Sequence, residues 1–230
     1  MSKELFDLTG KNALVTGGTH GIGVAIATGL AQAGAKIIIN STSPDKLELA
    51  KETYAKNGID VHAYVLDVTD ENAVNSTVPV MEEEAGSIDI LVNNAGIIKR
   101  TPILEMSADE FRQVLDANLT GQFIMAKAVG NGMVARKRGK IINMCSMMSE
   151  LGRNTVSAYA ASQTESLRVE GHPFNDFIIR RTPTGRWGAP EDLAGTAVFL
   201  ASSASDFVNG HIVYVDGGIL ATIGKPANEE

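Results

Sequence analysis

The alternation of short apolar runs with longer segments of helical period most constrains how this chain can fold. Apolar runs at 12–16, 36–40, 61–66, 88–92, 140–145 and 211–215 resemble strands, and segments at 23–33, 44–54, 72–84, 107–136 and 190–202 have a helical pattern. Continuous apolar runs are typical of strands buried on both faces, and strands that alternate with helices build parallel sheets. The sequence therefore predicts one α/β domain over residues 1–230, a doubly wound parallel sheet of the Rossmann-like kind.

The composition excludes several classes of protein. The 230 residues carry a formal net charge of −7, whereas general nucleic-acid binding needs a basic surface. Cys145 is the only cysteine, so an internal disulfide cannot form and a reducing compartment is expected. The apolar runs are too short to cross a membrane, residues 1–7 do not resemble a signal peptide, and the four histidines lack metal-ligand spacing. We therefore expect a cytoplasmic protein with no metal and with neither a nucleic-acid nor a membrane partner.

A glycine-rich turn joins the first predicted strand to the first predicted helix. It runs from Thr16 to Gly23 as TGGTHGIG, so its glycines are spaced G-x-x-x-G-x-G rather than G-x-G-x-x-G. Glycine lets the backbone approach a diphosphate closely, and a helix N-terminus offers free amide groups and a partial positive charge. The turn therefore predicts a dinucleotide-binding site, and the alternative is a turn with a purely structural role.

The end of the second predicted strand bears on the choice between NAD and NADP. An acidic residue in this region binds the adenosine ribose of NAD, but this sequence has Asn40, Ser41 and Thr42 there. A 2′-phosphate would meet hydroxyls and amides, with His20 nearby, and no repelling carboxylate. These residues favour NADP over NAD, although no arginine is present for a bidentate contact. The alternative is that they only cap the next helix, for which Ser43 is suited.

Further motifs follow in order along the chain. They are Asn93-Asn-Ala-Gly96, Asn118, Ser146 at the end of the fifth strand, Tyr159, the segment Arg186-Trp-Gly-Ala-Pro-Glu-Asp-Leu, and Val215-Asp-Gly-Gly218. Single motifs of this length are weak, but together and in this order they resemble the short-chain dehydrogenase/reductase family. The resemblance covers nearly the whole chain, and it implies hydride transfer between a nicotinamide cofactor and a hydroxyl or carbonyl.

The resemblance also implies roles for individual residues. Catalysis would fall to Ser146, which binds the substrate oxygen, to Tyr159, which transfers the proton, and to Asn118, which holds a water of a proton relay. Ser149 is the alternative serine, and taken alone Tyr159 would be a packing residue. The implied cofactor-binding set is Gly17, His20, Gly21, Ile22, Gly23, Asn40, Ser41, Thr42, Asp67, Val68, Asn94, Ala95 and Gly96. Within this set, Asp67 and Val68 would contact the adenine.

The sequence departs from the family at a position that matters for the chemistry. A free tyrosine has a pKa near 10, and in this family a lysine four residues later stabilises the phenolate. Here Gln163 occupies that position. Residues 149–188 also lack an expected helix and strand, since their one strand-like run is Phe177-Ile-Ile. Either a helix–strand segment is missing between residues 162 and 163 of this sequence, or the protein lacks that segment.

Within the family, residues 97–100, 145–152 and 172–174 look most like gluconate 5-dehydrogenase and related sugar-acid oxidoreductases. An anionic small-molecule substrate would pair with Arg100 or Lys99, and Glu150 could bind sugar hydroxyls, unless these are solvated surface charges. A rival enzyme is a 3-oxoacyl-carrier-protein reductase, with residues 136–138 as a basic docking face. A catalytically silent nucleotide-binding scaffold is the alternative of another class. The resemblance further implies a homotetramer.

Overall fold

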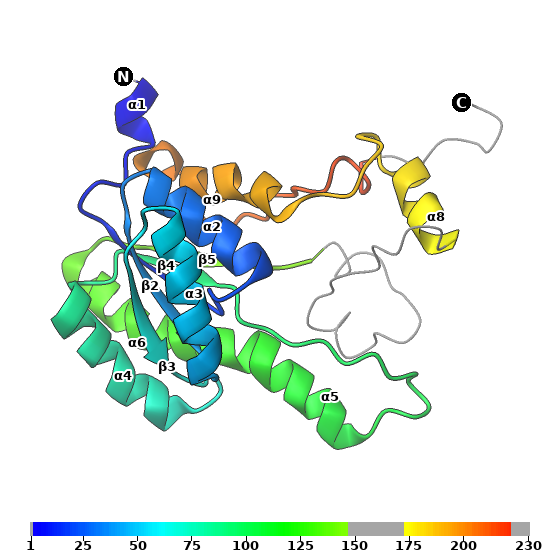
Figure 1. The fold of residues 1–230 in the computed structure, drawn as a ribbon, viewed down its shortest axis with the longest axis horizontal. Coiled ribbons are helices and arrows are strands. Elements are labelled where there is room, and N and C mark those ends of the chain that lie inside the picture. The colour runs from blue at the N-terminus through cyan, green and yellow to red at the C-terminus, as the bar shows by residue number, and fades with distance from the viewer. Residues whose placement is uncertain (1, 147–172, 222–230) are drawn as a thin grey trace.

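A five-stranded parallel sheet forms the centre of the computed structural model, which describes residues 2–146 and 173–221 (Figure 1). The strands are β1 (Asn12–Thr16), β2 (Lys36–Ser41), β3 (Val61–Val65), β4 (Ile90–Asn93) and β5 (Lys140–Asn143). Their order across the sheet is β3-β2-β1-β4-β5, and every neighbouring pair is parallel. The predicted fold class is confirmed, because the first five predicted strands all belong to this sheet.

The helices cover both faces of the sheet. They are α1 (Ser2–Leu5), α2 (Gly21–Gln32), α3 (Pro44–Lys56), α4 (Glu71–Ala85), α5 (Ala108–Leu115), α6 (Gly121–Arg136), α8 (Pro173–Arg181) and α9 (Ala194–Ala201). Shorter helical turns are η1 (Asp116–Thr120), η3 (Pro190–Leu193) and η4 (Ser203–Ser205). Helices α2, α3 and α9 pack on one face, and α4 and α6 pack on the other (Figure 1). Within the described ranges, none of the helices has the length and apolar character needed to span a membrane.

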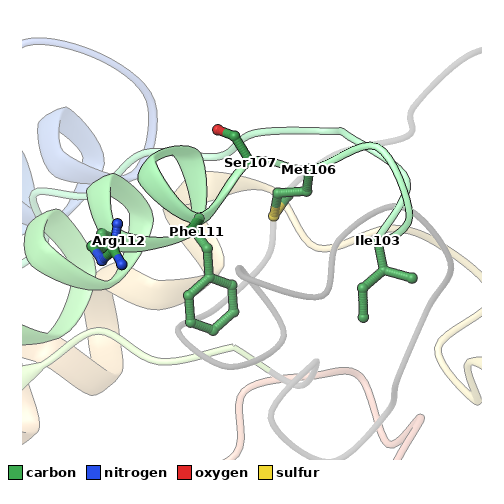
Figure 2. Close-up of a pocket in the computed structure, with 6 residues that line it drawn as sticks. Ile103, Met106, Ser107, Phe111 and Arg112 are labelled. Atoms are coloured by element: carbon green, nitrogen blue, oxygen red, sulfur yellow. The ribbon is translucent and has the colours of Figure 1, made fainter.

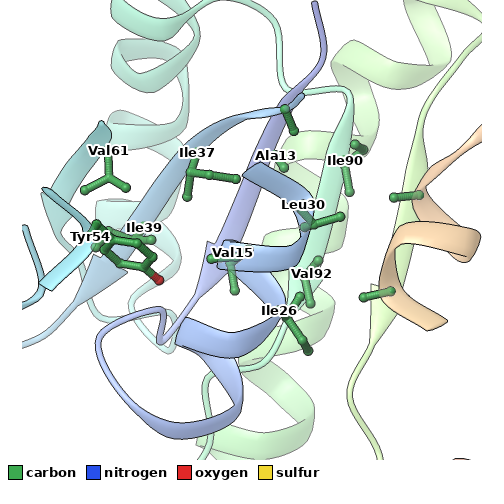
Figure 3. Packing of buried hydrophobic residues seen from close by; sticks show 14 of the residues in the cluster. Ala13, Val15, Ile26, Leu30, Ile37, Ile39, Tyr54, Val61, Ile90 and Val92 are labelled. Carbon is green, nitrogen blue, oxygen red and sulfur yellow. The ribbon is translucent and has the colours of Figure 1, made fainter. Parts of the chain in front are cut away.

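Two apolar cores lie on opposite faces of the sheet. Successive strand residues point to opposite faces, so each strand contributes to both cores. Val15, Ile37 and Ile39 pack in the core beneath α2 and α3 (Figure 3). Leu14 and Ile38 pack in the core beneath α4 and α6. All five side chains are fully buried, which explains why the strand sequences are continuously apolar.

The long helix predicted over residues 107–136 is interrupted. Ser107 caps α5, because its hydroxyl accepts a hydrogen bond from the Glu110 amide at 3.1 Å and the Glu110 carboxylate accepts one from the Ser107 amide at 3.1 Å. The hydrogen bond from that amide also lowers the pKa of Glu110. The π-helical turn η1 then separates α5 from α6. Such a turn keeps the chain helical, so residues 107–136 still have the composition of one long helix and the sequence does not reveal the turn.

The prediction of a strand over residues 211–215 is wrong. This segment has no regular secondary structure and belongs to no sheet of the described residues, and Ile212 is 63% exposed. A strand needs a neighbouring edge, and within the described part of the chain none pairs with the outer edge of β5. The strand-like run Phe177-Ile-Ile is also not a strand, because it lies in α8.

Candidate active site

The carboxyl ends of β1 and β4 meet where the strand order reverses. The chain passes from β1 to β2 and β3 on one side, and then to β4 and β5 on the other. Ligands of open parallel sheets bind in the crevice outside the carboxyl ends at such a point. The glycine-rich turn follows β1 and the Asn94-Ala95-Gly96 loop follows β4, so both predicted motifs lie at this crevice.

Direct hydrogen bonds join these two loops. The Thr16 hydroxyl oxygen accepts from the backbone amides of Asn94 and Ala95, each at 2.9 Å. The Asn94 side-chain amide donates to the carbonyl of Thr16 at 2.9 Å and to that of Gly17 at 3.3 Å. Thr16 is only 1% exposed, so little water competes for these bonds. The start of the glycine-rich turn is therefore fixed against the end of β4.

The glycines of the turn are required by its geometry. A Cβ atom on Gly17 would lie 3.0 Å from the Ala95 Cα, and one on Gly23 would lie 2.5 Å from the Gly17 carbonyl oxygen. Gly17 and Gly21 also have left-handed backbones, with φ of 64° and 54°. Because α2 begins at Gly21, its first-turn amides lack intrahelical acceptors. A turn with glycines at these close approaches, at a helix N-terminus, fits the diphosphate of a dinucleotide.

His20 and Ile22, also in the turn, differ in whether their side chains can reach a ligand. His20 is the N-cap residue of α2 and is exposed, and its Nδ1 lies 3.1 Å from the Thr19 hydroxyl. Ile22 packs against the core beneath α2 and α3. The His20 side chain is accordingly open to a ligand, whereas the Ile22 side chain faces the protein.

The end of β2 carries hydroxyls and an amide, but no carboxylate. Asn40 is 2% exposed, and its side-chain amide donates to the Leu66 carbonyl at 2.9 Å, which ties β2 to β3. Ser43 caps α3, as in the structural alternative, because its hydroxyl accepts a hydrogen bond from the first turn at 3.3 Å. Ser41 is partly buried and Thr42 is exposed. Ser41 and Thr42 thus remain the candidates for a ribose or phosphate contact.

The predicted adenine-binding residues have structural partners. Asp67 is exposed, and its carboxylate accepts from the Thr69 amide at 2.9 Å and the Thr69 hydroxyl at 2.8 Å. Val68 is buried against α6, where a Cβ atom on Gly121 would lie 2.8 Å from the Val68 Cγ2. Asp67 therefore stabilises its own turn and Val68 packs in the core. Their contact with adenine stays a prediction.

Asn118 fixes the loop that follows β4. It lies in η1 and is 4% exposed. Its side-chain oxygen accepts from the Ile97 amide at 2.7 Å, and its side-chain nitrogen donates to the Ile97 carbonyl at 2.9 Å. A Cβ atom on Gly96 would lie 3.1 Å from the same oxygen. The structure thus brings Asn118 to the crevice, and its relay role stays a prediction.

Ser146 lies beyond β5 rather than at its end. The strand ends at Asn143, whose side-chain oxygen accepts from the Asn93 side-chain amide at 2.9 Å. Ser146 follows three residues later and is half-buried. The predicted residues Ser149, Glu150, Tyr159 and Gln163 lie outside the described residues. The contact between Ser146 and Tyr159 therefore stays a prediction.

The two candidate cations after β4 differ in their surroundings. The Lys99 ammonium donates to the side-chain oxygen of Gln113 on α5 at 2.6 Å. Arg100 is exposed in the same loop. The position of this loop, at the carboxyl end of β4, is compatible with the predicted substrate contact of Arg100.

A separate cavity of about 360 Å³ lies at the N-terminal end of α5 (Figure 2). Its lining is mostly apolar and consists of Ile103, Met106, Ser107, Ala108, Phe111 and Arg112. The Arg112 guanidinium is paired with Asp109 at 2.7 Å. None of the predicted site residues that the structure describes lines this cavity, so it does not enter the description of the active site.

Sequence reasoning missed two residues that hold the glycine-rich turn. Thr16 joins the turn to β4, and the Tyr54 hydroxyl donates to the Gly18 carbonyl at 2.8 Å. A hydroxyl at a strand end, directly before two glycines, is a signal that could have indicated Thr16. Tyr54 looks like an ordinary packing residue of a helix, since its partner is distant in the sequence.

Comparisons with known proteins agree with this geometry. A family model described as short chain dehydrogenase matches residues 11–165, and one described as Enoyl-(Acyl carrier protein) reductase matches residues 153–220. A 2-dehydro-3-deoxy-D-gluconate 5-dehydrogenase of Formosa agariphila is 54% identical and is aligned over 100% of both chains. A 5-keto-D-gluconate 5-reductase of Escherichia coli is 42% identical, with 96% of this chain and 99% of the relative covered. Both relatives are thus similar along nearly their whole length.

A solved structure is also similar to this chain along nearly its whole length. A gluconate 5-dehydrogenase from Burkholderia cenocepacia in complex with NADP and tartrate superimposes with a TM-score of 0.90 at 38% identity, covering 97% of this chain and 100% of that one.

A parallel sheet with a glycine-rich turn at its strand-order reversal defines the class of dinucleotide-binding α/β proteins. The chain belongs to the short-chain dehydrogenase family, which confirms the predicted resemblance. It is an NAD(P)-dependent oxidoreductase.

Proposed function

We propose that this enzyme interconverts the hydroxyl and keto forms of a small sugar acid of the gluconate type, with NADP as its preferred cofactor. The observation that carries the substrate class is the 54% identity, over the full length of both chains, to a 2-dehydro-3-deoxy-D-gluconate 5-dehydrogenase. The 42% identity to a 5-keto-D-gluconate 5-reductase supports the same class. The names of these two relatives describe enzymes of sugar acids, which argues against a 3-oxoacyl-carrier-protein reductase.

The end of β2 supports the preference for NADP. Ser41 and Thr42 offer hydroxyl donors to a 2′-phosphate, and no carboxylate in residues 40–43 would repel it. A similar solved structure, at 38% identity, contains NADP. The turn from Gly17 to Gly23 would hold the diphosphate through its backbone amides.

The proposed chemistry divides between cofactor and protein. The nicotinamide supplies the hydride chemistry when bound. Ser146 would donate a hydrogen bond to the substrate oxygen, and the Tyr159 hydroxyl would exchange a proton with that oxygen. Asn118 would keep a water of the relay in place while its side chain holds the Ile97 backbone. Glu150 would bind sugar hydroxyls, and Arg100 would pair with the substrate carboxylate.

A helix–strand segment is also proposed to belong between Ser162 and Gln163, within one domain that spans the chain. The alignment with the Formosa agariphila relative extends over 264 positions, 34 more than the chain has residues. The two family models overlap at residues 153–165, around the proposed junction. A lysine as the first residue of this segment would restore the spacing that the Tyr159 phenolate needs. Sequencing the encoded protein, with its intact mass, tests this directly.

The assembly and location are proposed from the resemblance to the family. We expect a homotetramer in the cytoplasm, acting on a free small molecule. Light scattering of the native protein measures the assembly, and a monomer at micromolar concentration would contradict it. Fractionation of the source cells tests the location.

Steady-state assays test the substrate and the cofactor together. Gluconate and 2-dehydro-3-deoxy-D-gluconate are offered with NADP and with NAD, and an acetoacetyl thioester is offered with NADPH. We expect turnover of at least one sugar acid, and a higher kcat/KM with NADP than with NAD. Turnover of the thioester alone would establish the rival reductase, whereas cofactor binding without any turnover would establish a silent scaffold.

A variant tests the substrate contact. Arg100→Ala should raise the KM for the sugar acid by about 10- to 150-fold, because a charge-assisted hydrogen bond is worth about 1.5–3 kcal/mol. The control is Arg112→Ala, since that guanidinium is paired with Asp109 on the exposed side of α5. An unchanged KM in Arg100→Ala would remove Arg100 from the site.

A further inference from the structure

The carbonyl of Gly18, inside the glycine-rich turn, is held from within the core. The hydroxyl of Tyr54 on α3 donates to the Gly18 carbonyl oxygen at 2.8 Å, and the Tyr54 side chain is 0% exposed. Tyr54 belongs to the same core as Ile39, and the two lie close together in Figure 3. A Cβ atom on Gly18 would lie 2.5 Å from the Ile39 Cγ2. Gly18 therefore rests on an apolar surface and is oriented by a single hydroxyl.

This hydrogen bond also sets the direction of the next amide. Every peptide bond in the described part of the chain is trans, so the carbonyl of Gly18 and the N–H of Thr19 point in opposite directions. The carbonyl points into the core toward Tyr54. The Thr19 N–H therefore points away from Tyr54 and out of the core.

The two residues before Gly18 in the turn are held in a similar manner. The Asn94 side-chain amide donates to the carbonyls of Thr16 and Gly17, at 2.9 Å and 3.3 Å. Three successive carbonyls, those of residues 16–18, are thus bound by protein side chains. Successive amides that are turned outward form an anion-binding concavity. Tyr54 supplies the last of these three contacts.

We propose that Tyr54 is a positioning residue for cofactor binding, whose hydroxyl holds the Gly18–Thr19 peptide so that the Thr19 amide faces the cofactor diphosphate. This inference rests on the proposed binding of NADP at the glycine-rich turn. Tyr54 acts through the backbone and contacts neither cofactor nor substrate. Burial raises the pKa of Tyr54, so the hydroxyl remains a protonated donor at every working pH.

The variant Tyr54→Phe isolates the hydroxyl from the packing of the ring. Two ligands report on different parts of the site: NADP contains the diphosphate, and 2′-AMP contains the adenosine and the 2′-phosphate but no diphosphate bridge. We expect Tyr54→Phe to weaken NADP about 3- to 10-fold, the size of one hydrogen bond, and to leave 2′-AMP unchanged. Calorimetric titration of both ligands measures this difference.

The matched control is Tyr64→Phe. The Tyr64 hydroxyl donates to the Glu84 carboxylate at 2.6 Å, on the face of α4 and far in sequence from the turn. This control removes the same atom from another tyrosine and should change neither ligand's affinity. Unchanged NADP affinity in Tyr54→Phe would overturn the inference. An equal loss for NADP and 2′-AMP would also overturn it, because a general loosening of the site affects both ligands.

A measurement on the unaltered protein gives a second test. In protein labelled with ¹⁵N-threonine, NADP should shift the Thr19 amide resonance strongly, and clearly more than 2′-AMP does. A Thr19 amide that responds to neither ligand, while both bind, would refute the proposed role of Tyr54 but not the proposed function. Failure of the unaltered protein to bind NADP or NAD at all would end the proposed function and this inference with it.

Discussion

Asn118 illustrates how one buried side chain organises the loop beside the site. Both ends of its amide are bound to the backbone of Ile97, at 2.7 Å and 2.9 Å, and the side chain is 4% exposed. An amide is the group that can donate to a carbonyl and accept from an N–H at the same time. A carboxylate or an aliphatic side chain at this position would leave one or both Ile97 groups without a partner.

Replacement of Asn118 should therefore destabilise the protein. We expect Asn118→Ala to lower the free energy of unfolding by about 1–2 kcal/mol, since two hydrogen bonds are lost and water can replace them only in part. Urea unfolding measures this change. Asn131→Ala, at an exposed position of α6, is the control and should stay within about 0.5 kcal/mol of the unaltered protein. Equal effects of the two variants would contradict the structural role of Asn118.

Gly23 tests the close packing within the glycine-rich turn. A Cβ atom there would lie 2.5 Å from the Gly17 carbonyl oxygen and 2.8 Å from the Asn94 side-chain nitrogen. Gly23→Ala must displace the turn, so we expect NADP affinity to fall by about tenfold or more. Gly195→Ala on α9 is the matched control, because a Cβ atom there meets no atom within 4 Å. Normal NADP binding by Gly23→Ala, measured by calorimetry, would contradict the proposed diphosphate site.

At the scale of the elements, β5 and residues 211–215 indicate that the sheet lacks a strand beside β5. β5 pairs only with β4 among the described residues, and Ile141 on β5 is 43% exposed. Residues 211–215 are mostly apolar and form no strand, and among the described residues no strand lies beside them. An open sheet edge and exposed apolar segments are liabilities in folded proteins. The proposed segment after Ser162 would supply the strand that both of them need.

Hydrogen exchange of the 230-residue chain, which lacks the proposed segment, should show this difference between the elements. In that chain we expect the amides of Ile212 and Val213 to exchange rapidly, because they are not part of a ladder. The amides of Ile37 and Ile39, buried in β2, should be strongly protected and serve as the internal control. Protection at Ile212 equal to that at Ile39 would mean that the segment does pair with another strand.

The same elements show how far the sequence determines the fold. The strands β1 to β5 could be predicted because burial on both faces makes each of them continuously apolar. Residues 211–215 have that same local pattern, yet a strand forms only where a partner edge exists, and this depends on the rest of the chain. The π-turn at η1 was not predicted either, because a π-turn keeps the chain helical and its residues continue the helical pattern of the helices on both sides.

The candidate site was predictable to a similar degree. The turn from Thr16 to Gly23 and the loop from Asn93 to Gly96 were identified by motif, and the sheet brings them together. Tyr54 was not identified, because only the tertiary fold brings α3 close enough to hydrogen-bond Gly18.

At the scale of the whole molecule, completing the sheet should stabilise it. We expect a chimera that carries the Formosa agariphila relative's extra residues between Ser162 and Gln163 to melt about 5 °C or more above this chain. The reason is that exposed apolar side chains such as Ile212 and Val213 would become buried. An insertion of equal length made of glycine and serine is the control. A chimera that melts no higher than this control would contradict the proposed position of the segment.

The most direct test of the whole account is a crystal structure of the intact protein grown with NADP. We predict that the diphosphate lies at the turn from Gly17 to Gly23, with its oxygens about 2.7–3.2 Å from backbone amides of the turn. NADP bound elsewhere on the molecule would contradict the account, as would a turn without ligand at saturating NADP and at saturating NAD.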